Sequence, residues 1–179
     1  QDYKGHSALH RDNDITTVTE LISNGANVNT KSEYNVTALM TFASFGKPVV
    51  VKVLLRNGAN VNDLDYKSRS PLHYASSGYS ADKDRAYVAF ILHFFGAKID
   101  AMDVKNETPL HYSSKHGDLE VSKLLIKFGA DPNARNNMLQ TPLHLTTNPE
   151  IATFLVKSGA KIDAKDNLND TKLCDASWH

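Results

Sequence analysis

One pattern recurs along this chain, and it constrains the fold more than any other feature of the sequence. Each unit opens with a Thr or Ser and closes with a Gly-Ala pair. The opening residue stands at Ser7, Thr37, Ser70, Thr108, Thr141 and Thr171, at intervals of 30, 33, 38, 33 and 30 residues. The Gly-Ala pair begins at Gly25, Gly58, Gly96, Gly129 and Gly159. Two independent landmarks in one register predict a stacked array of similar units, whose neighbours bury each other's apolar faces.

The most regular unit, residues 103–134, shows what a repeat contains. Thr108 and Pro109 precede an apolar run, which is typical of a helix start because the hydroxyl caps free N–H groups and proline needs no partner there. A short helix and a break follow, and a second helix is expected over residues 119–128. Gly129 then ends this helix, because glycine adopts positive φ without penalty. Each repeat is therefore predicted to be a helix pair, and the fold class an all-α solenoid (α-solenoid).

The second repeat contains a segment that is ambiguous by propensity. Three consecutive valines, residues 49–51, would suit a strand. Pro48 before them and Gly58 after them favour a helix instead. We therefore expect a helix here.

The third repeat is longer, with 23 residues from His73 to Gly96. The extra residues fall in 77–85, a polar stretch that is expected to form a surface loop between helices. The second helix of this repeat is expected over residues 86–95. Its four aromatic side chains are expected to fill the core against the neighbouring repeats. They are Tyr87, Phe90, Phe94 and Phe95.

Both ends of the chain hold incomplete units. The first repeat is short, and the sixth begins at Asp166 and stops after Trp178-His179. Either the chain belongs to a longer array, or these units serve as imperfect caps. Trp178 is expected to cover the exposed face of the last repeat. Cys174 has no local signature of a nucleophile and is expected to be a small, semi-buried residue.

Composition excludes several classes of protein. Twenty Lys and Arg residues balance 20 Asp and Glu residues, so neither a nucleic-acid nor a membrane footprint is expected. A single cysteine allows no internal disulfide, which suits a reducing interior. No apolar run approaches the roughly 18 residues of a membrane span. The first residues do not read as a signal peptide. We expect a cytoplasmic or nuclear protein.

The repeated motifs resemble those of the ankyrin-repeat family over essentially the whole chain. Thr-Pro-Leu-His is complete at residues 108–111 and 141–144, and residues 70–73 differ only in the first position. The resemblance implies antiparallel helix pairs stacked side by side, with short β-hairpin fingers along one edge. It also implies binding of another protein through the fingertips and the concave helix face. Enzymatic activity, a cofactor or a small-molecule substrate is not implied.

The chain is accordingly expected to form a single ankyrin-repeat domain over residues 1–179, with about five repeats and a partial sixth. The repeats are expected at residues 2–31, 32–64, 65–102, 103–135 and 136–165, and the partial one at 166–179.

The finger turns depart from the family pattern, in which glycine occupies one turn position. Asparagine replaces it at Asn35, Asn106 and Asn169, and this residue tolerates positive φ. Ser68 and Leu139 occupy the same position in two other fingers. A leucine does not sit comfortably there, so the turn over residues 136–140 is expected to be distorted.

Four histidines occupy one repeated slot, at His10, His73, His111 and His144. A metal site needs three or four ligands that converge on one point. Equivalent positions of a repeat array are instead spread along it, so we expect these histidines to hydrogen-bond turns and helix starts. No metal site is expected.

The resemblance also implies that two asparagines are candidates for asparaginyl hydroxylation. Asn29 and Asn62 end the Asn-Val-Asn stretches of two fingers, and Leu21 and Leu54 lie eight residues before them. The competing interpretation is a plain structural role in the finger.

The partner-binding residues are placed by register alone, at variable turn positions and at neighbouring positions of the first helices. Several of them are aromatic residues, arginine or methionine, which are enriched at interface hot spots. The candidates are Glu33, Tyr34, Phe45, Tyr66, Lys67, Arg69, Ser77, Lys105, Glu107, Lys115, His116, Met138 and Gln140.

The expected function is non-enzymatic binding of a partner protein, as an adaptor or a masking inhibitor. The uneven repeats and the composition rich in Asn, Lys, Ile and Ser resemble those of ankyrin proteins of viruses and intracellular bacteria that intercept host factors. The alternative is a targeting domain of a larger enzyme, ubiquitin-ligase adaptor or channel, whose activity lies outside this chain.

Overall fold

The computed structural model describes Leu9, residues 14–78 and residues 82–172. The chain divides into two compact units, Gln1–Lys98 and Ile99–His179. The helices of the described residues are α1 (Ile15–Ser23), α2 (Ala38–Ser44), α3 (Pro48–Arg56), α4 (Pro71–Ser76), α5 (Asp82–Phe94), α6 (Pro109–His116), α7 (Leu119–Lys127), α8 (Pro142–Leu145) and α9 (Pro149–Lys157).

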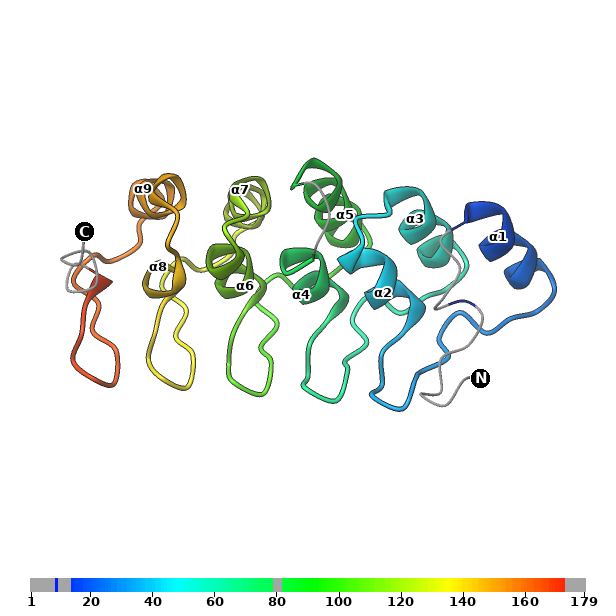
Figure 1. Cartoon of the computed structure of the whole chain (residues 1–179), viewed down its shortest axis with the longest axis horizontal. Coiled ribbons are helices and arrows are strands. Elements are labelled where there is room, and N and C mark those ends of the chain that lie inside the picture. Colours follow the sequence, from blue (N-terminus) through cyan, green and yellow to red (C-terminus); the bar gives the residue numbers. More distant parts are fainter. Residues whose placement is uncertain (1–8, 10–13, 79–81, 173–179) are drawn as a thin grey trace. The chain divides into compact units, whose positions relative to one another are not determined.

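In each unit the helices form two rows, an inner row beside the fingers and an outer row farther from them (Figure 1). In the first unit α2 packs against α4, and α3 packs against α1 and α5. In the second unit α6 packs against α8, and α7 packs against α9. Each inner helix also packs against the outer helix that follows it in sequence. The prediction of an all-α array of stacked helix pairs is confirmed.

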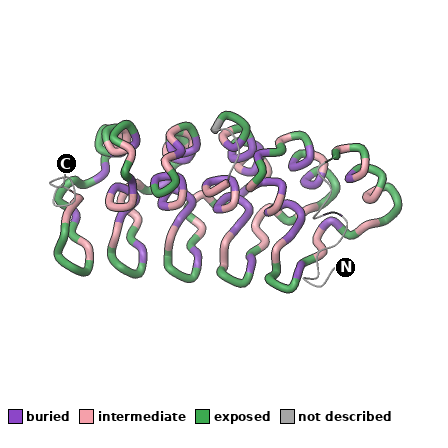
Figure 2. Tube along the Cα trace, viewed as in Figure 1, coloured by how far each residue is buried: buried purple, intermediate pink, exposed green. Residues whose placement is uncertain are grey.

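Many of the buried residues lie where the helices of each unit face one another (Figure 2). In the first unit Phe42, Leu54 and Leu72 are fully buried, and in the second Leu110 and Leu125 are. Burying a leucine or phenylalanine side chain contributes about 1.5–3 kcal/mol. The valines at 49–51 lie in α3, as expected, and two of the three form part of its buried side.

The inner helices begin with a repeated capping arrangement. The backbone N–H groups of Ser70, Thr108 and Thr141 donate to Nδ1 of the histidine three residues later, each at 3.1 Å. A capping box normally uses Glu or Gln at this third position, and here the imidazole replaces the carboxylate or amide. The described histidines of this slot serve helix starts, as expected. His10 lies outside the described residues.

The tautomer of His111 follows from its two partners. Because Nδ1 accepts the Thr108 N–H, the ring proton is on Nε2, which lies 3.1 Å from the carbonyl oxygen of Gln140 and donates to it. Burial lowers the pKa of His111, while the Gln140 carbonyl acts in the opposite direction. This neutral histidine therefore links the start of α6 to the finger of the next repeat.

The fingertips are tight turns of five residues, at 32–36, 65–69, 103–107, 136–140 and 166–170. In four of them the first side chain is Asp or Asn, and its Oδ1 accepts two backbone N–H groups from within the turn. The first backbone N–H donates to the carbonyl of the fifth residue in every turn. Among the described residues the one recorded β-bridge joins Lys31 and Thr37.

The prediction that the Leu139 turn is distorted is wrong. Leu139 has φ 59°, close to the 57° of Asn106. Its finger also keeps the standard hydrogen bonds: Asn136 N–H donates to Gln140 O at 3.0 Å, and Leu139 N–H donates to Asn136 O at 2.8 Å. The leucine therefore adopts the left-handed conformation at a steric cost, because the surrounding hydrogen bonds determine the turn.

Two expectations about the third repeat are also wrong. Helix α5 begins at Asp82, inside the segment that was expected to be a surface loop, and Arg85 in that segment is buried. The buried side of α5 carries Val88, Ala89, Ile91 and Leu92. Tyr87, Phe90 and Phe94 are exposed instead, because they project from the opposite side of the helix, and Phe95 follows the helix end.

The sixth unit is described as far as Lys172, and its finger turn is formed. Ser7, Cys174 and Trp178 lie outside the described residues, as do the expectations attached to them.

Candidate functional site: the finger surface

In the first unit, two of the predicted fingertip tyrosines lie together. The Tyr66 N–H donates to the Tyr34 carbonyl at 3.1 Å, and the two ring centroids are 5.3 Å apart. The Lys67 ammonium lies 5.3 Å from the centre of the Tyr66 ring. Tyr34 is 47% exposed and Tyr66 is 52% exposed. We call Tyr34, Tyr66 and Lys67 the tyrosine patch, a surface with amphipathic rings and one cation.

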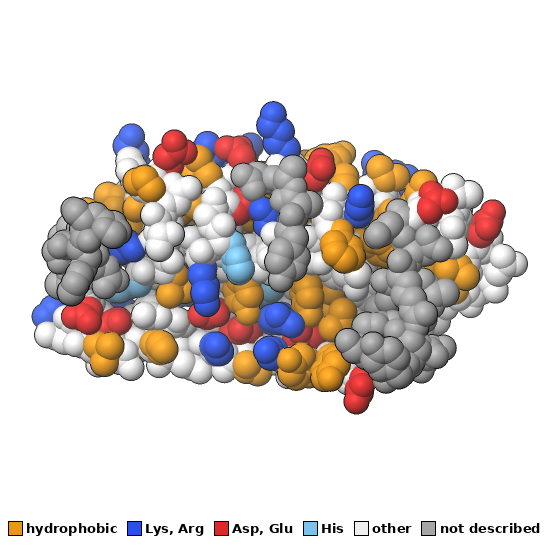
Figure 3. Space-filling model, viewed as in Figure 1, with side chains coloured by type: hydrophobic (Ala, Val, Ile, Leu, Met, Phe, Trp, Pro, Cys, Tyr) orange, Lys and Arg blue, Asp and Glu red, His pale blue; other side chains and the backbone are white. Residues whose placement is uncertain are grey.

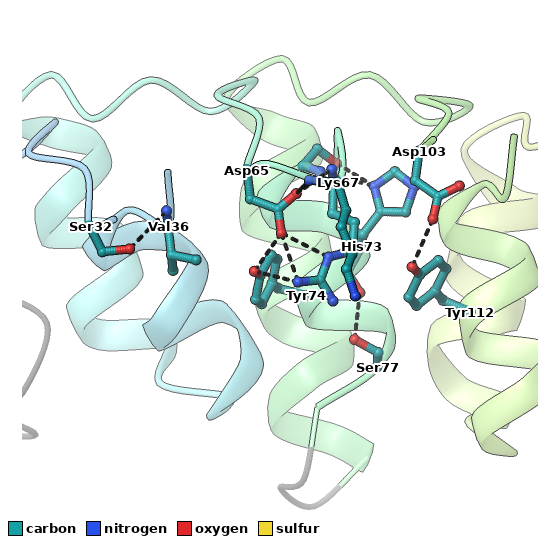
Figure 4. A network of polar contacts seen from close by, with 11 residues as sticks. Ser32, Val36, Asp65, Lys67, His73, Tyr74, Ser77, Asp103 and Tyr112 are labelled. Carbon is teal, nitrogen blue, oxygen red and sulfur yellow. Dashed lines mark hydrogen bonds and ion pairs between the residues drawn. The ribbon is translucent and has the colours of Figure 1, made fainter. Parts of the chain in front are cut away.

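Arg69, another candidate, is engaged inside its own repeat. Its guanidinium contacts the Asp65 carboxylate at 2.7 Å and donates to the Tyr74 hydroxyl at 2.9 Å. Figure 4 shows the Tyr74 hydroxyl directed at Asp65, to which it donates at 2.8 Å. This network fixes the finger at residues 65–69 against α4.

The pKa values of the network reflect these contacts. Burial alone would raise the pKa of the Asp65 carboxyl, but hydrogen bonds from Arg69 and Tyr74 outweigh burial and hold this pKa below its usual value. Burial and the bond to Asp65 raise the pKa of the Tyr74 hydroxyl far above its usual value. A charged, buried carboxylate is therefore a fixed part of the finger.

The remaining candidates of the first unit take no part in the ring and cation contacts of the tyrosine patch. Glu33 is exposed in the fingertip at residues 32–36. Phe45 is 41% exposed at the end of α2. Ser77 follows α4, and its hydroxyl donates to the His73 carbonyl at 3.0 Å. Ser77 therefore serves the helix end as well as the surface.

In the second unit, five candidates line one groove, together with Asn136, Asn137 and Leu145. We call this the finger groove. Its volume is about 340 Å³. The five candidates are Lys105, Glu107, Lys115, Met138 and Gln140. Positions that the sequence placed on two fingers and one helix thus converge on one site.

The finger groove combines charge with an apolar floor. Lys105 and Lys115 are exposed and face only one lining carboxylate, that of Glu107. Met138, 49% exposed, supplies the adaptable apolar contact. Figure 3 shows hydrophobic and basic side chains next to one another along the edge where the fingers lie. Such a surface can take a partner side chain in its apolar part and a carboxylate at its lysines.

His116 lies beside this site rather than in it. Its ring stacks on Tyr112 with the centroids 6.4 Å apart, and the Tyr112 hydroxyl donates to Asp103 at 3.0 Å (Figure 4). Asn136, Asn137 and Leu145 line the groove as well but are not among the predicted candidates. Leu145 is accessible because α8 ends there. The interval from His144 to Gly159 is only 15 residues, which indicates a short first helix in this repeat and could have revealed the accessible Leu145.

The two candidates for hydroxylation have equivalent contacts. The Asn29 amide donates to the Gly58 carbonyl at 2.9 Å and accepts the Asn60 N–H at 2.9 Å. Asn62 makes the same two bonds, to Gly96 and from Lys98. We call this arrangement the asparagine staple, because it joins one finger base to the next.

No three His, Cys, Asp or Glu side chains among the described residues are grouped so as to hold a metal ion. None of the helices in the described ranges is long and apolar enough to cross a membrane.

Comparison with known proteins gives consistent matches. A family model of ankyrin repeats in three copies matches residues 5–83 and 79–166. Human protein phosphatase 1 regulatory subunit 27 is 42% identical over 57 residues, which are 30% of this chain and 37% of that protein. An ankyrin repeat protein of Acanthamoeba polyphaga mimivirus is 42% identical over 59 residues, or 33% of this chain and 36% of that protein.

A potassium channel of Oryza sativa subsp. japonica is 40% identical over 60 residues, 32% of this chain and 8% of the channel. The matched stretches thus span well under half of these relatives. Since the family model covers most of the sequence, the chain belongs to the ankyrin-repeat family, a generally non-enzymatic family of protein–protein interaction modules.

Proposed function

We propose that this chain binds a partner protein through its finger surface, by the tyrosine patch in the first unit and the finger groove in the second. The observation that carries the proposal is the convergence of Lys105, Lys115 and Met138 on one groove. Arginine, methionine and aromatic residues are the types enriched at interfaces, and the two tyrosines of the patch are half exposed. We propose that the remaining candidates, Glu33, Phe45, Arg69, Ser77 and His116, add contacts to the partner outside these two sites.

The fingertips suit this role because their backbones are fixed before binding. In each tip, backbone N–H groups donate to the side chain of the first turn residue. Within each unit, backbone bonds also join neighbouring tips, such as that from Asn137 N–H to Lys105 O at 2.9 Å. A partner therefore meets an ordered surface, which limits the entropy lost on association.

Two roles are compatible with such a module. The first is an adaptor or masking inhibitor, and the name of the human relative, a regulatory subunit of protein phosphatase 1, supports this kind of role. The mimivirus relative supports the narrower proposal of a viral or bacterial protein that binds a host factor. A reducing intracellular compartment suits a chain with a single cysteine.

The second role is a targeting domain of a larger protein. The match to a rice potassium channel supports it, since only 8% of that channel is involved. Within either role we propose the chain as one ankyrin-repeat domain over residues 1–179. The sequence beyond these residues would separate the two roles, because a catalytic or channel segment would favour the second.

Quantitative pull-down from cell extract tests the finger surface. Wild type is compared with Tyr34→Ala/Tyr66→Ala and with Lys105→Ala/Met138→Ala, and the matched control is Lys127→Ala, an exposed change on an outer helix. Arg69 is left intact because its loss would disturb the Asp65 network. Partners recovered by wild type and control but depleted with a finger variant support the proposal. Equal recovery by all four proteins would refute it.

For Asn29 and Asn62 we propose hydroxylation as a modification that competes with the staple's structural role. Peptide mass spectrometry on protein from oxygen-replete cells tests this. An added oxygen at Asn29 or Asn62, but not at Asn133, supports it. Unmodified peptides at both positions would leave the staple as their function.

A further inference from the structure

The outer helix α5 exposes an aromatic stripe. Tyr87 is 51% exposed, Phe90 45% and Phe94 76%. The three residues are spaced three and four apart, so they project from one side of the helix. Exposed aromatic side chains are unfavourable in water, and a contiguous group of them marks a surface that contacts something else.

The other outer helices show that the fold does not require this stripe. When the helices are aligned on the glycine of the Gly-Ala pair, the three positions can be compared directly. The equivalent residues are Thr16, Thr19 and Ser23 in α1; Val49, Lys52 and Arg56 in α3; Glu120, Lys123 and Lys127 in α7; and Glu150, Thr153 and Lys157 in α9. Eleven of these twelve are polar or charged. The aromatic residues are therefore peculiar to α5.

The stripe forms one wall of a groove between α3 and α5 in the first unit. The groove has a volume of about 360 Å³ and is lined by Lys52, Arg56, Tyr87, Phe90, Ile91, Phe94 and Phe95. We call it the aromatic groove. The rings of Tyr87 and Phe90 are stacked with centroids 6.3 Å apart, and those of Phe94 and Phe95 meet edge to face at 5.7 Å.

The charge of the aromatic groove has one sign. Lys52 and Arg56 are one helical turn apart on α3, both are exposed, and no acidic residue lines the groove. An apolar floor with a basic edge is complementary to an apolar stripe with an acidic edge. The stripe from Tyr87 to Phe94 extends about 10 Å along α5, which corresponds to two turns of a partner helix.

We propose that the aromatic groove docks an amphipathic helix of a partner protein, with apolar residues at i, i+3 and i+7 and acidic residues one turn apart facing Lys52 and Arg56. The aromatic side chains bury the apolar stripe of this helix, and the two cations pair with its carboxylates. In the first unit α3 and α5 belong to the outer row, away from the fingers (Figure 1). This docking is therefore independent of the finger surface.

A synthetic peptide of this chemistry tests the proposal by fluorescence anisotropy. The probe is an amphipathic helix with leucine at i, i+3 and i+7 and glutamate on its flanks, and the comparison peptide has lysine in place of each glutamate. Wild type is expected to bind the glutamate peptide saturably, and less tightly as salt is raised. Phe90→Thr/Phe94→Ser, which introduces the α1 residues, is expected to weaken binding at least about tenfold.

A charge exchange supplies the second test. Lys52→Glu/Arg56→Glu is expected to lose the glutamate peptide and to bind the lysine peptide. The matched control, Lys123→Glu/Lys127→Glu, makes the same change at the equivalent positions of α7 and is expected to leave binding unchanged. Circular dichroism checks that each variant is folded. Tyr34→Ala/Tyr66→Ala is also expected to bind the glutamate peptide normally. The test of the aromatic groove is therefore separate from the test of the finger surface.

Several results would overturn the proposal. They are no binding of the glutamate peptide to wild type, equal binding of both peptides, or undiminished binding to Phe90→Thr/Phe94→Ser. Self-association in sedimentation experiments that this variant abolishes would assign the groove to a second copy of the chain instead. Binding to phosphatidylserine vesicles that the variant abolishes, without peptide binding, would assign it to a membrane surface.

Discussion

Asp100 interrupts the series of asparagine staples, and its replacement by asparagine should stabilise the second unit. In the intact staple of that unit, the Asn133 amide donates to Gly159 O at 2.9 Å and accepts the Lys161 N–H at 2.9 Å. At the equivalent position, Asp100 accepts the Asp131 N–H through both oxygens at 3.3 Å. An ionised carboxylate has no proton to donate to the facing carbonyl.

The magnitude follows from the missing bond. One intramolecular hydrogen bond contributes about 0.5–1.5 kcal/mol net. Because Asp100 is an exposed residue, we expect the lower half of this range, about 0.5–1 kcal/mol, for Asp100→Asn at pH 7. An increase of about 1 kcal/mol would raise the Tm by roughly 2–4 °C in a chain of this size.

The gain should depend on pH. Although the Asp100 residue is exposed, its carboxyl is partly desolvated, and this desolvation together with the neighbouring Asp131 charge raises its pKa. The Asp131 N–H acts in the opposite direction. A carboxyl with a raised folded-state pKa favours folding when it is protonated, and this contribution is lost as the pH rises through that pKa. The advantage of Asp100→Asn should therefore be largest at neutral pH and shrink as the pH falls toward 4.

Urea unfolding followed by circular dichroism at pH 7 and pH 4.5 measures both effects. The reciprocal variant Asn133→Asp is the matched control and should lower the free energy of unfolding by a similar amount at pH 7. If Asn133→Asp is destabilising while Asp100→Asn is neutral or destabilising, the missing amide is not what distinguishes position 100. A gain that does not change with pH would refute the role of ionisation.

Three further predictions concern the turns and the helix starts. Leu139→Asn should raise the free energy of unfolding, measured by urea titration, by about 1 kcal/mol because asparagine tolerates positive φ. Asn106→Leu should lower this free energy by a similar amount. A lower free energy of unfolding for Leu139→Asn would contradict the strain argument. Gly78→Ala should lower the free energy of unfolding by about 1–3 kcal/mol, since a Cβ there would lie 2.0 Å from the Ser44 carbonyl oxygen, and an unchanged urea midpoint would refute this. His111 has a lowered pKa, so its stabilising effect is complete above about pH 6.5 and is lost as the pH falls through its folded-state pKa. The urea midpoint should fall between pH 7 and pH 5, and fall less in His111→Gln.

The repeat register could be predicted from the sequence because its signals are local. A Thr-Pro pair starts a helix and a Gly-Ala pair ends one, whatever the neighbouring repeats contain. The same register located Lys105, Lys115 and Met138, which the structure brings into one groove. Repetition supplied the geometry that a single motif could not.

The predictions that were wrong concern residues whose conformation or burial depends on surrounding parts of the fold. Leu139 adopts an unfavourable φ because the hydrogen bonds of Asn136 determine the turn, and propensity does not include them. The aromatic residues of α5 were expected inside because hydrophobicity favours burial. The register of α5 instead directs Val88 and Leu92 inward, and the aromatic groove lies outward. Pattern alone did not show which side of this helix faces the core.

Within each unit, backbone hydrogen bonds join neighbouring fingertips. Tyr66 N–H donates to Tyr34 O at 3.1 Å, and Asn167 N–H donates to Met138 O at 3.0 Å. Substitution of an exposed tip residue leaves its N–H and carbonyl in place, unless proline is introduced. The tips can therefore accumulate mutations while the spacing between them is kept. Such a surface can exchange one partner for another in the course of evolution without rebuilding the scaffold that presents it.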